Sequence, residues 1–257
     1  MEKHKINGIS FTAGVWPAPA NRMTLIFIHG SGETSLLWDA QVAALAAEYN
    51  TLALDLPGHG ESDGPGMDTV ADYANAIMAF VQKAGLANLV PCGLSIGGAI
   101  VQQMLLGHAD KLQAGILVST GARLRVMPQI FETIEKDYQQ FVAMSRLFAA
   151  SPKTPATLLD PLMEVTARCD PAVTAGDFRA CDRFDVMARL GEITRPVLII
   201  SAEDDQLTPP KYSDFLEKNI ARAVRCRITG AGHVVPVEKP HEVTRAIDAF
   251  LESLASL

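Results

Sequence analysis

The chain has 257 residues, of which 48% are hydrophobic and 20% are charged, so we expect one main domain around a sizeable core. Its formal net charge of −7 and the lack of a lysine or arginine run disfavour nucleic acid and anionic membranes as partners. Residues 1–10 carry no signal-peptide core, and no stretch reaches the roughly 18 apolar residues of a membrane-spanning helix, so we expect a cytoplasmic protein. The four cysteines lie far apart, without the spacing of a zinc or redox site, and are expected to be reduced packing residues.

Short aliphatic runs alternate with stretches of helical periodicity along the chain. The runs, which are typical of strands buried on both faces, are 24–28, 51–55, 88–94, 114–119, 196–201 and 224–229. The expected helices are 35–48, 69–84, 97–107, 209–219 and 240–255. Parallel neighbours need long right-handed crossovers, so this alternation predicts an α/β fold in which helices cover both faces of a mostly parallel sheet.

Residues 122–190 interrupt the alternation, because they contain several prolines, no strand-like run and apolar residues at helical spacing. We therefore expect a core domain formed by residues 1–121 and 191–257, and a helical cap, or lid, formed by 122–190. Such an insertion would lie over the carboxyl edge of the sheet, where ligands bind in open α/β folds. The candidate substrate-binding residues in it, which could equally pack its own helices together, are Met127, Ile130, Phe131, Phe141, Met144, Leu147 and Phe148.

A serine stands where one predicted strand turns into a predicted helix. Ser95 lies between Gly93 and Gly97, and small residues on both sides allow a turn tight enough to push the hydroxyl out of the sheet edge. The helix start also offers unpaired N–H groups to an oxyanion. Alone the pattern is weak, because the glycines could serve helix–sheet packing and the serine could be a cap.

A serine hydroxyl needs a base, and the base needs an acid to orient it. His233 lies in a glycine-rich loop after the last strand-like run and before the final helix, which places it at the same sheet edge. The acid is expected in the stretch after the strand 196–201, where Asp204 and Asp205 are adjacent. Only one of the two can face the histidine, since successive side chains at a strand end point to opposite sides.

Five motifs together resemble the α/β-hydrolase superfamily over nearly the whole chain. They are "FIHGSG" (27–32), "LDLPGHGES" (54–62), "GLSIGG" (93–98), "SAEDDQLTP" (201–209) and "GAGHVVPVEKP" (230–240). The resemblance implies an α/β-hydrolase fold with the helical cap inserted after the sixth strand. It also implies Ser95 as nucleophile, His233 as base, and Asp205 as acid because it stands four residues before Pro209. Ala202 replaces the glycine usual in that last motif.

The same resemblance implies an oxyanion hole made by the backbone N–H groups of Ile96 and Ser31. His29 and His59 are expected to organise loops rather than to take part in chemistry. Glu33 departs from the family pattern. If its carboxylate faces the pocket it would disfavour anionic substrates, and otherwise it is a solvated loop charge.

These features predict a serine hydrolase that cleaves a small or medium carboxylic ester, thioester or lactone through an acyl-enzyme on Ser95. The expected partner is a small-molecule substrate, and the expected chemistry needs no metal and no organic cofactor. The motifs most resemble esterases, enol-lactonases and carbon–carbon bond hydrolases. A carbon–carbon hydrolase or lyase that uses the same triad, and a hydrolase-fold ligand receptor, are the alternatives. Dehalogenases and epoxide hydrolases are disfavoured because they place an aspartate where Ser95 stands.

Overall fold

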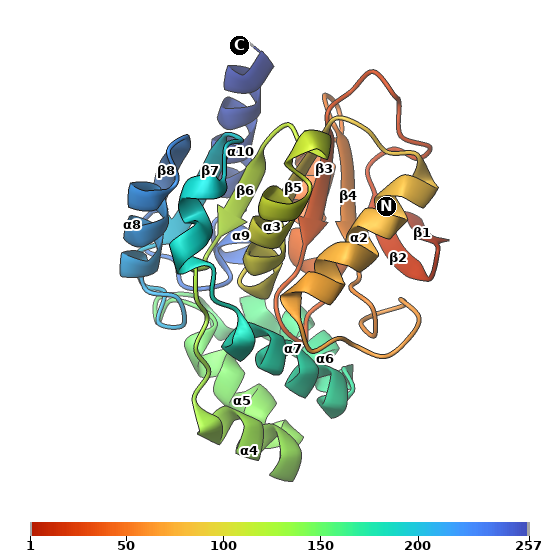
Figure 1. Cartoon of the computed structure of the whole chain (residues 1–257). Helices are drawn as coiled ribbons and strands as arrows, with labels where there is room; N and C mark the ends of the chain where they lie inside the picture. Colours follow the sequence, from red (N-terminus) through yellow and green to blue (C-terminus); the bar gives the residue numbers. More distant parts are fainter. Residues whose placement is uncertain (1, 256–257) are drawn as a thin grey trace.

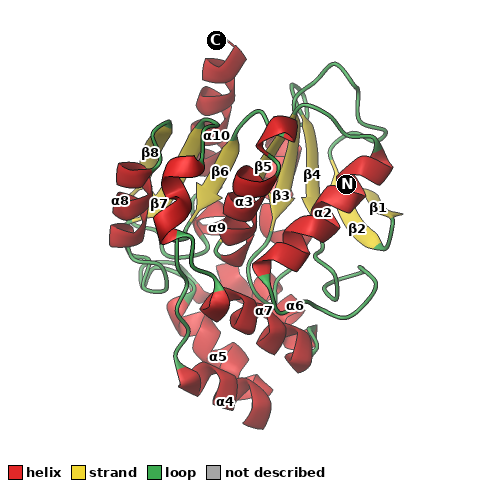
Figure 2. Cartoon of the chain, in the orientation of Figure 1, coloured by secondary structure: helices red, strands yellow, loops and turns green. Residues whose placement is uncertain are grey.

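An eight-stranded sheet forms the middle layer of the protein in the computed structural model, which describes residues 2–255 (Figures 1 and 2). The strand order is β1-β2-β4-β3-β5-β6-β7-β8. Pairing is antiparallel between β1 and β2 and between β2 and β4, and parallel elsewhere. The strands are β1 Glu2–Ile6, β2 Ile9–Ala13, β3 Thr24–Ile28, β4 Asn50–Leu54, β5 Leu89–Leu94, β6 Gly115–Val118, β7 Val197–Ala202 and β8 Ala223–Ile228.

Helices cover both faces of this sheet, so the predicted fold class is confirmed (Figure 2). In Figure 1, α2, α3 and α8 lie on the near face, and α9 and α10 lie behind the strands. The α-helices are α1 Asp39–Leu45, α2 Val70–Ala84, α3 Ile96–Gly107, α4 Pro128–Lys136, α5 Tyr138–Phe148, α6 Asp160–Arg168, α7 Pro171–Arg183, α8 Pro210–Asn219, α9 Val235–Glu238 and α10 Pro240–Ala255. The 3₁₀ helices are η1 Ser35–Trp38, η2 Ala109–Lys111, η3 Ala156–Leu159 and η4 Met187–Glu192.

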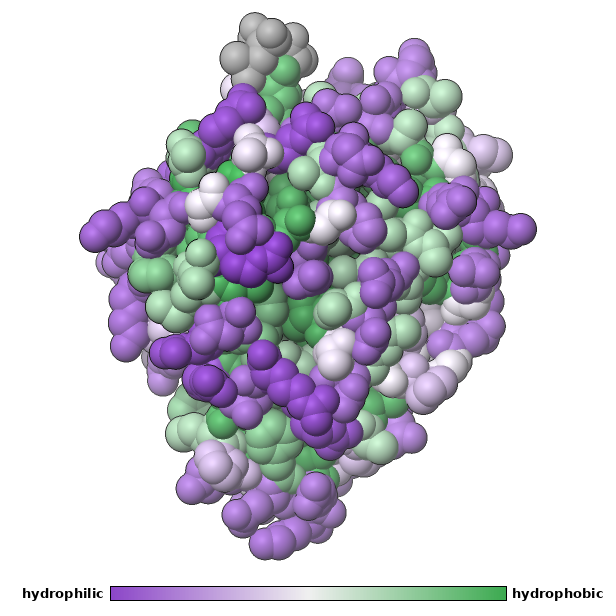
Figure 3. Space-filling view, viewed as in Figure 1, coloured by the Kyte–Doolittle hydropathy of each residue, from purple (hydrophilic) through white to green (hydrophobic). Residues whose placement is uncertain are grey.

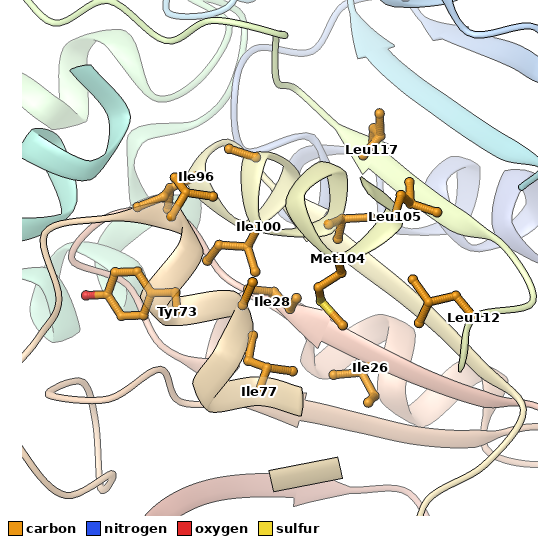
Figure 4. Close-up of a cluster of buried hydrophobic side chains, with 14 of the residues drawn as sticks. Ile26, Ile28, Tyr73, Ile77, Ile96, Ile100, Met104, Leu105, Leu112 and Leu117 are labelled. Atoms are coloured by element: carbon orange, nitrogen blue, oxygen red, sulfur yellow. The ribbon is translucent and has the colours of Figure 1, made fainter. Parts of the chain in front are cut away.

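The core fills the space between the sheet and the helices on each face. Every residue of the central strands β3, β4, β5, β6 and β7 is buried, as expected of strands with helices on both sides. Figure 4 shows the near face, where Ile77 from α2 and Ile100 and Met104 from α3 lie around Ile28 of β3. Burying such side chains contributes about 1.5–3 kcal/mol each, so this packing holds α2 and α3 against the sheet.

The N-terminal hairpin of β1 and β2 was not predicted, because the strands expected from the sequence begin at residue 24. Its turn is Asn7-Gly8, and both residues have positive φ, 51° and 79°, as a two-residue type I′ hairpin requires. β1 reads EKHKI and is mostly exposed, so it shows neither the aliphatic run of a buried strand nor a clear apolar face. The Asn-Gly pair was the available signal for this hairpin.

Residues 122–190 form helices only, apart from an isolated bridge between Arg123 and Asp185. They contain α4, α5, α6 and α7, which Figure 1 shows together below the lower end of the sheet, where the chain leaves β6. Figure 3 shows hydrophilic residues over most of one face of the molecule, with apolar patches between them in this lower region. Among residues 2–255, no helix has the length and apolar character needed to cross a bilayer.

The topology opens a crevice between the ends of β3 and β5. From β3 the chain first moves outward to β4 and then returns to the other side of β3 as β5. The loops after β3 and β5 therefore diverge from two neighbouring parallel strands, and such a switch point is the usual ligand site in open α/β sheets. Ser31 follows β3 and Ser95 follows β5, so both lie at this point.

Candidate active site

Ser95 occupies a strained turn between β5 and α3. Its φ is 57° and its ψ is −116°, a backbone conformation that residues other than glycine rarely adopt. Three hydrogen bonds hold it there: the Ser95 N–H donates to the Val118 carbonyl at 3.0 Å, and the Ser95 carbonyl accepts from Thr120 Oγ1 at 2.7 Å and from the Ala99 N–H at 3.1 Å. The surrounding backbone thus fixes the direction in which the hydroxyl points.

The flanking glycines are required by close backbone contacts. A Cβ on Gly93 would overlap the Gly97 backbone and lie 2.6 Å from the Gly98 nitrogen. A Cβ on Gly97 would overlap the Ile28 carbonyl oxygen and lie 2.8 Å from that of His29. Helix α3 therefore begins against the end of β3, which brings the Ser95 turn close to the loop after β3.

His233 forms a buried pair with Asp205. The distances from His233 Nδ1 to the carboxylate oxygens are 3.1 and 3.0 Å, and the carboxylate also accepts from the N–H groups of Leu207 and Thr208 and from Thr208 Oγ1, at 2.9, 2.9 and 2.8 Å. Because a carboxylate only accepts, Nδ1 carries the proton and the neutral ring keeps its lone pair on Nε2. Burial lowers the pKa of His233, but the charge and hydrogen bond of Asp205, together with the charges of Glu33 and Glu238, outweigh this and leave that pKa above its ordinary value.

The contacts of the two candidate acids, Asp204 and Asp205, differ. Asp204 makes its contacts with other side chains, since its Oδ2 accepts from Ser151 Oγ at 2.6 Å and lies 3.9 Å from Lys153 Nζ. Burial raises the pKa of Asp205, and the nearby His233 together with the hydrogen bonds to the carboxylate more than reverses this, so the pKa lies below its ordinary value. Asp205 is thus the carboxylate that contacts the histidine.

Ser95 and His233 line the same cavity, which has a volume of about 330 Å³ and lies between the sheet edge and residues 122–190. Among residues 2–255, no hydrogen bond joins the Ser95 hydroxyl to His233 in this structure. Cys181 also lines the cavity, but burial raises the pKa of its thiol to about 12, so it stays protonated. Ser95 is therefore the candidate nucleophile of the cavity.

Most of the candidate substrate-binding residues line this cavity. Those that do are Met127, Ile130, Phe141, Met144 and Phe148. Phe131 is half-buried and Leu147 is exposed, and neither borders the cavity, because they lie on other sides of α4 and α5. The cavity also has apolar walls that the spacing of the insertion alone did not single out: Leu124, Val126, Met163, Phe178 and Tyr212.

Two backbone N–H groups are free near Ser95. Ser31 borders the cavity, and Ile96 is the first residue of α3 with its side chain in the core shown in Figure 4. Within residues 2–255, neither the Ser31 nor the Ile96 N–H donates a backbone hydrogen bond. Free donors of this kind suit an oxyanion formed next to Ser95.

A buried network holds the loop that carries Ser31. Asp177 of α7 is fully buried and accepts from the Gly32 N–H at 2.9 Å, from His59 Nε2 at 2.9 Å and from Tyr73 Oη at 2.6 Å. Burial lowers the pKa of His59, but Asp177 outweighs it and raises that pKa. Asp177 was not predicted from the sequence, because its partners lie in three other segments of the chain.

His29 and His59 both hold loops, as expected. His29 Nδ1 donates to the Gly30 carbonyl at 2.7 Å, and its Nε2 accepts from the Leu56 N–H at 3.0 Å. Burial and the neighbouring His59 lower the pKa of His29 to about 4, so its ring is neutral. Neither imidazole borders the cavity. In the part of the chain that the structure describes, no three His, Cys, Asp or Glu side chains form a group suited to a metal ion.

Comparison with known proteins agrees with this architecture. The sequence model of the alpha/beta hydrolase family matches residues 25–246. A pimeloyl-(acyl-carrier protein) methyl ester esterase from Pectobacterium carotovorum is 23% identical over 249 residues, covering 91% of this chain and 96% of the relative. The structure of the enol-lactonase from Burkholderia xenovorans LB400 has a TM-score of 0.86 at 22% identity and covers 98% of this chain and 100% of its own. The structure of a thermophilic esterase has a TM-score of 0.80 at 31% identity and covers 98% of this chain and 97% of its own. Because the family match spans most of its length, the chain belongs to the alpha/beta hydrolase family and is a hydrolase-type enzyme.

Proposed function

We propose that the protein is a serine hydrolase that cleaves a small or medium carboxylic ester, thioester or lactone through an acyl-enzyme on Ser95. The observation that carries this proposal is the strained Ser95 turn and the Asp205–His233 pair bordering one cavity. Similarity to proteins named as esterases and as an enol-lactonase supports the same substrate classes.

In the first half-reaction, Ser95 Oγ attacks the carbonyl carbon of the substrate while His233 Nε2 takes the hydroxyl proton. The Ser95 hydroxyl must come within hydrogen-bonding distance of Nε2 for this transfer. The carbonyl oxygen becomes an oxyanion, which accepts hydrogen bonds from the N–H groups of Ser31 and Ile96. When the intermediate collapses, the bond to the leaving oxygen or sulfur breaks, His233 returns the proton to it, and the acyl group stays on Ser95.

In the second half-reaction, water gives its proton to His233 and its oxygen attacks the acyl carbon. The second oxyanion collapses, the bond to Ser95 Oγ breaks, and the serine regains its proton from the imidazolium. Asp205 stays ionised throughout, since it accepts three hydrogen bonds besides that of His233. Its role is to fix the tautomer and to stabilise the imidazolium.

The cavity argues for a modest, largely apolar acyl group. A volume of about 330 Å³ is at the lower end for small-molecule sites. Its walls come from both parts of the chain, with Ile130, Met144 and Phe178 from residues 122–190. We propose that residues 122–190 act as the cap of this site and that their apolar side chains select the acyl chain.

The test is a hydrolysis screen over esters, thioesters and lactones of graded acyl length, run on the wild type and on Ser95→Ala. Ser145→Ala is a matched control, because Ser145 lines the same cavity but bonds the Phe141 carbonyl at 2.9 Å. We expect turnover by the wild type and the control, loss of turnover in Ser95→Ala, and labelling of Ser95 by a fluorophosphonate. Turnover retained in Ser95→Ala would refute the acyl-enzyme. Activity confined to substrates that release a carbanion or enolate would assign a carbon–carbon hydrolase or lyase instead.

A further inference from the structure

Glu33 is a buried carboxyl group that the proposed chemistry does not use. It lies in the loop after β3, is 9% exposed, and lines the cavity together with Ser95 and His233. Its Oε2 accepts from the Gly30 N–H at 2.8 Å. Its Oε1 has no hydrogen-bond partner among residues 2–255, and it is not one of the polar atoms sealed inside the protein. One oxygen therefore holds the loop and the other is available to a molecule in the cavity.

The two basic side chains that line the cavity with Glu33, those of His233 and Arg125, each already face a carboxylate, Asp205 and Asp182 respectively. His233 and His59 act to lower its pKa and Asp177 acts to raise it, but burial is the largest influence and the pKa of Glu33 is raised overall. Arg125 is the guanidinium that lines the cavity, and its side chain is 61% exposed and donates to the Asp182 carbonyl at 3.1 Å. The remaining walls are mostly apolar, so a substrate anion bound beside Glu33 would lose much of its hydration next to a carboxyl group.

We propose that Glu33 is a specificity-determining residue that binds a neutral hydrogen-bond donor on the substrate, a hydroxyl or an amide N–H, and that excludes an acyl group carrying a carboxylate. This inference rests on the proposed ester hydrolysis, and it restricts the substrates of this site to esters with neutral acyl chains. Oε1 accepts from the donor, and a hydroxyl can in addition accept from the protonated acid. A substrate carboxylate can only accept, so ionised Glu33 repels it and it can bind only after Glu33 takes up a proton, whereas a hydroxyl can bind either form of Glu33.

The experiment compares three methyl esters with a six-carbon acyl chain: methyl hexanoate, methyl 6-hydroxyhexanoate and monomethyl adipate. Their far ends carry a methyl group, a hydroxyl group and a carboxylate, so their ratios of kcat/KM isolate that end. We expect the wild type to disfavour monomethyl adipate by on the order of 10- to 100-fold relative to methyl hexanoate, as a repulsive charge at low effective dielectric would do. We expect Glu33→Gln to reduce this factor about tenfold and to lower the preference for the hydroxyl ester several-fold.

Two further variants make the result decisive. Glu61→Gln removes the same charge from a side chain that is 65% exposed, and it should leave all three ratios unchanged. Glu33→Asp keeps the charge and should still exclude monomethyl adipate, which tests the proposal even if Glu33→Gln does not fold. Unchanged ratios in folded Glu33→Gln, or loss of exclusion in folded Glu33→Asp, would overturn the role of Glu33 alone. If the wild type hydrolyses none of the esters, thioesters and lactones in the screen described above, the proposed function is overturned, and this role with it.

Discussion

Replacing Asp177 by asparagine tests whether residues 122–190 hold the loop that carries Ser31. Asp177 lies on α7, 118 residues from His59, yet its Oδ2 contacts both His59 and the Gly32 N–H. An asparagine has one carbonyl oxygen, which can replace Oδ2, while its amide group can only donate. That amide would then face the Tyr73 hydroxyl, which already accepts from the Met67 N–H at 2.9 Å.

The variant therefore loses the 2.6 Å hydrogen bond from Tyr73 and the charge that strengthens the one from His59. Hydrogen bonds to charged buried groups contribute about 1.5–3 kcal/mol each, so we expect Asp177→Asn to lower the free energy of unfolding by about 2–4 kcal/mol. Gly32 follows Ser31 directly, so a shift of this loop also moves a proposed oxyanion donor. We expect kcat to fall by about tenfold or more, since small misplacements of catalytic groups are costly.

Urea unfolding followed by tryptophan fluorescence measures the stability change, and ester hydrolysis measures kcat. Asp170→Asn is the control, because it makes the same change at the N-cap of α7, where Asp170 accepts from the Ala172 N–H and asparagine caps equally well. The pKa of His59 is raised, so the stability that its charged form contributes is complete below about pH 6.5 and is lost as pH rises through the raised pKa. The difference between wild type and Asp177→Asn should therefore shrink from pH 6 to pH 9. Equal stability and equal kcat for wild type and Asp177→Asn would refute this reasoning.

Two more predictions follow from the contacts of His233 and its loop. Because Asp205 raises the pKa of His233 and the base must be neutral, kcat/KM of the wild type should rise with pH around a midpoint above 6.5. In Asp205→Asn this midpoint should move to lower pH, and kcat should fall on the order of 10³- to 10⁴-fold. A pH–rate profile of the variant with an unmoved midpoint would contradict this. Glu238 accepts from the N–H groups of Gly232 and Ser151, both at 2.8 Å, so Glu238→Ala should lower the free energy of unfolding by about 2–4 kcal/mol and also reduce kcat. Glu238→Gln should lower the free energy of unfolding and kcat by less. Thermal unfolding and initial rates measure both quantities, and unchanged stability and kcat in Glu238→Ala would be the contrary result.

The sequence by itself determined the features that depend on neighbouring residues. Apolar runs and helical periodicity predicted the parallel strands, and five helices outside residues 122–190, within a few residues of their bounds, because burial leaves a local pattern. The bounds of α4, α5, α6 and α7, and the short helix α9, were not predicted. Ser95 and His233 could also be named as candidate site residues, since each lies in a glycine-rich turn at the carboxyl end of a predicted strand. Strand ends of a parallel sheet meet at one edge, which is why two distant turns could be expected to border one cavity.

Tertiary structure alone decided which side chains meet across long separations. For the adjacent Asp204 and Asp205, the family resemblance favoured Asp205, but the physical reason lies in the packing, where Ser151 bonds Asp204 and Asp205 contacts His233. The placement of Glu33, which bonds the Gly30 N–H and lines the cavity, likewise has no local signature. Asp177 had no signal at all, because hydrogen bonds between distant segments form only once the helices have packed on the sheet. Local patterns thus fix turns and elements, whereas the partners of buried polar groups are fixed by the packing that desolvates them.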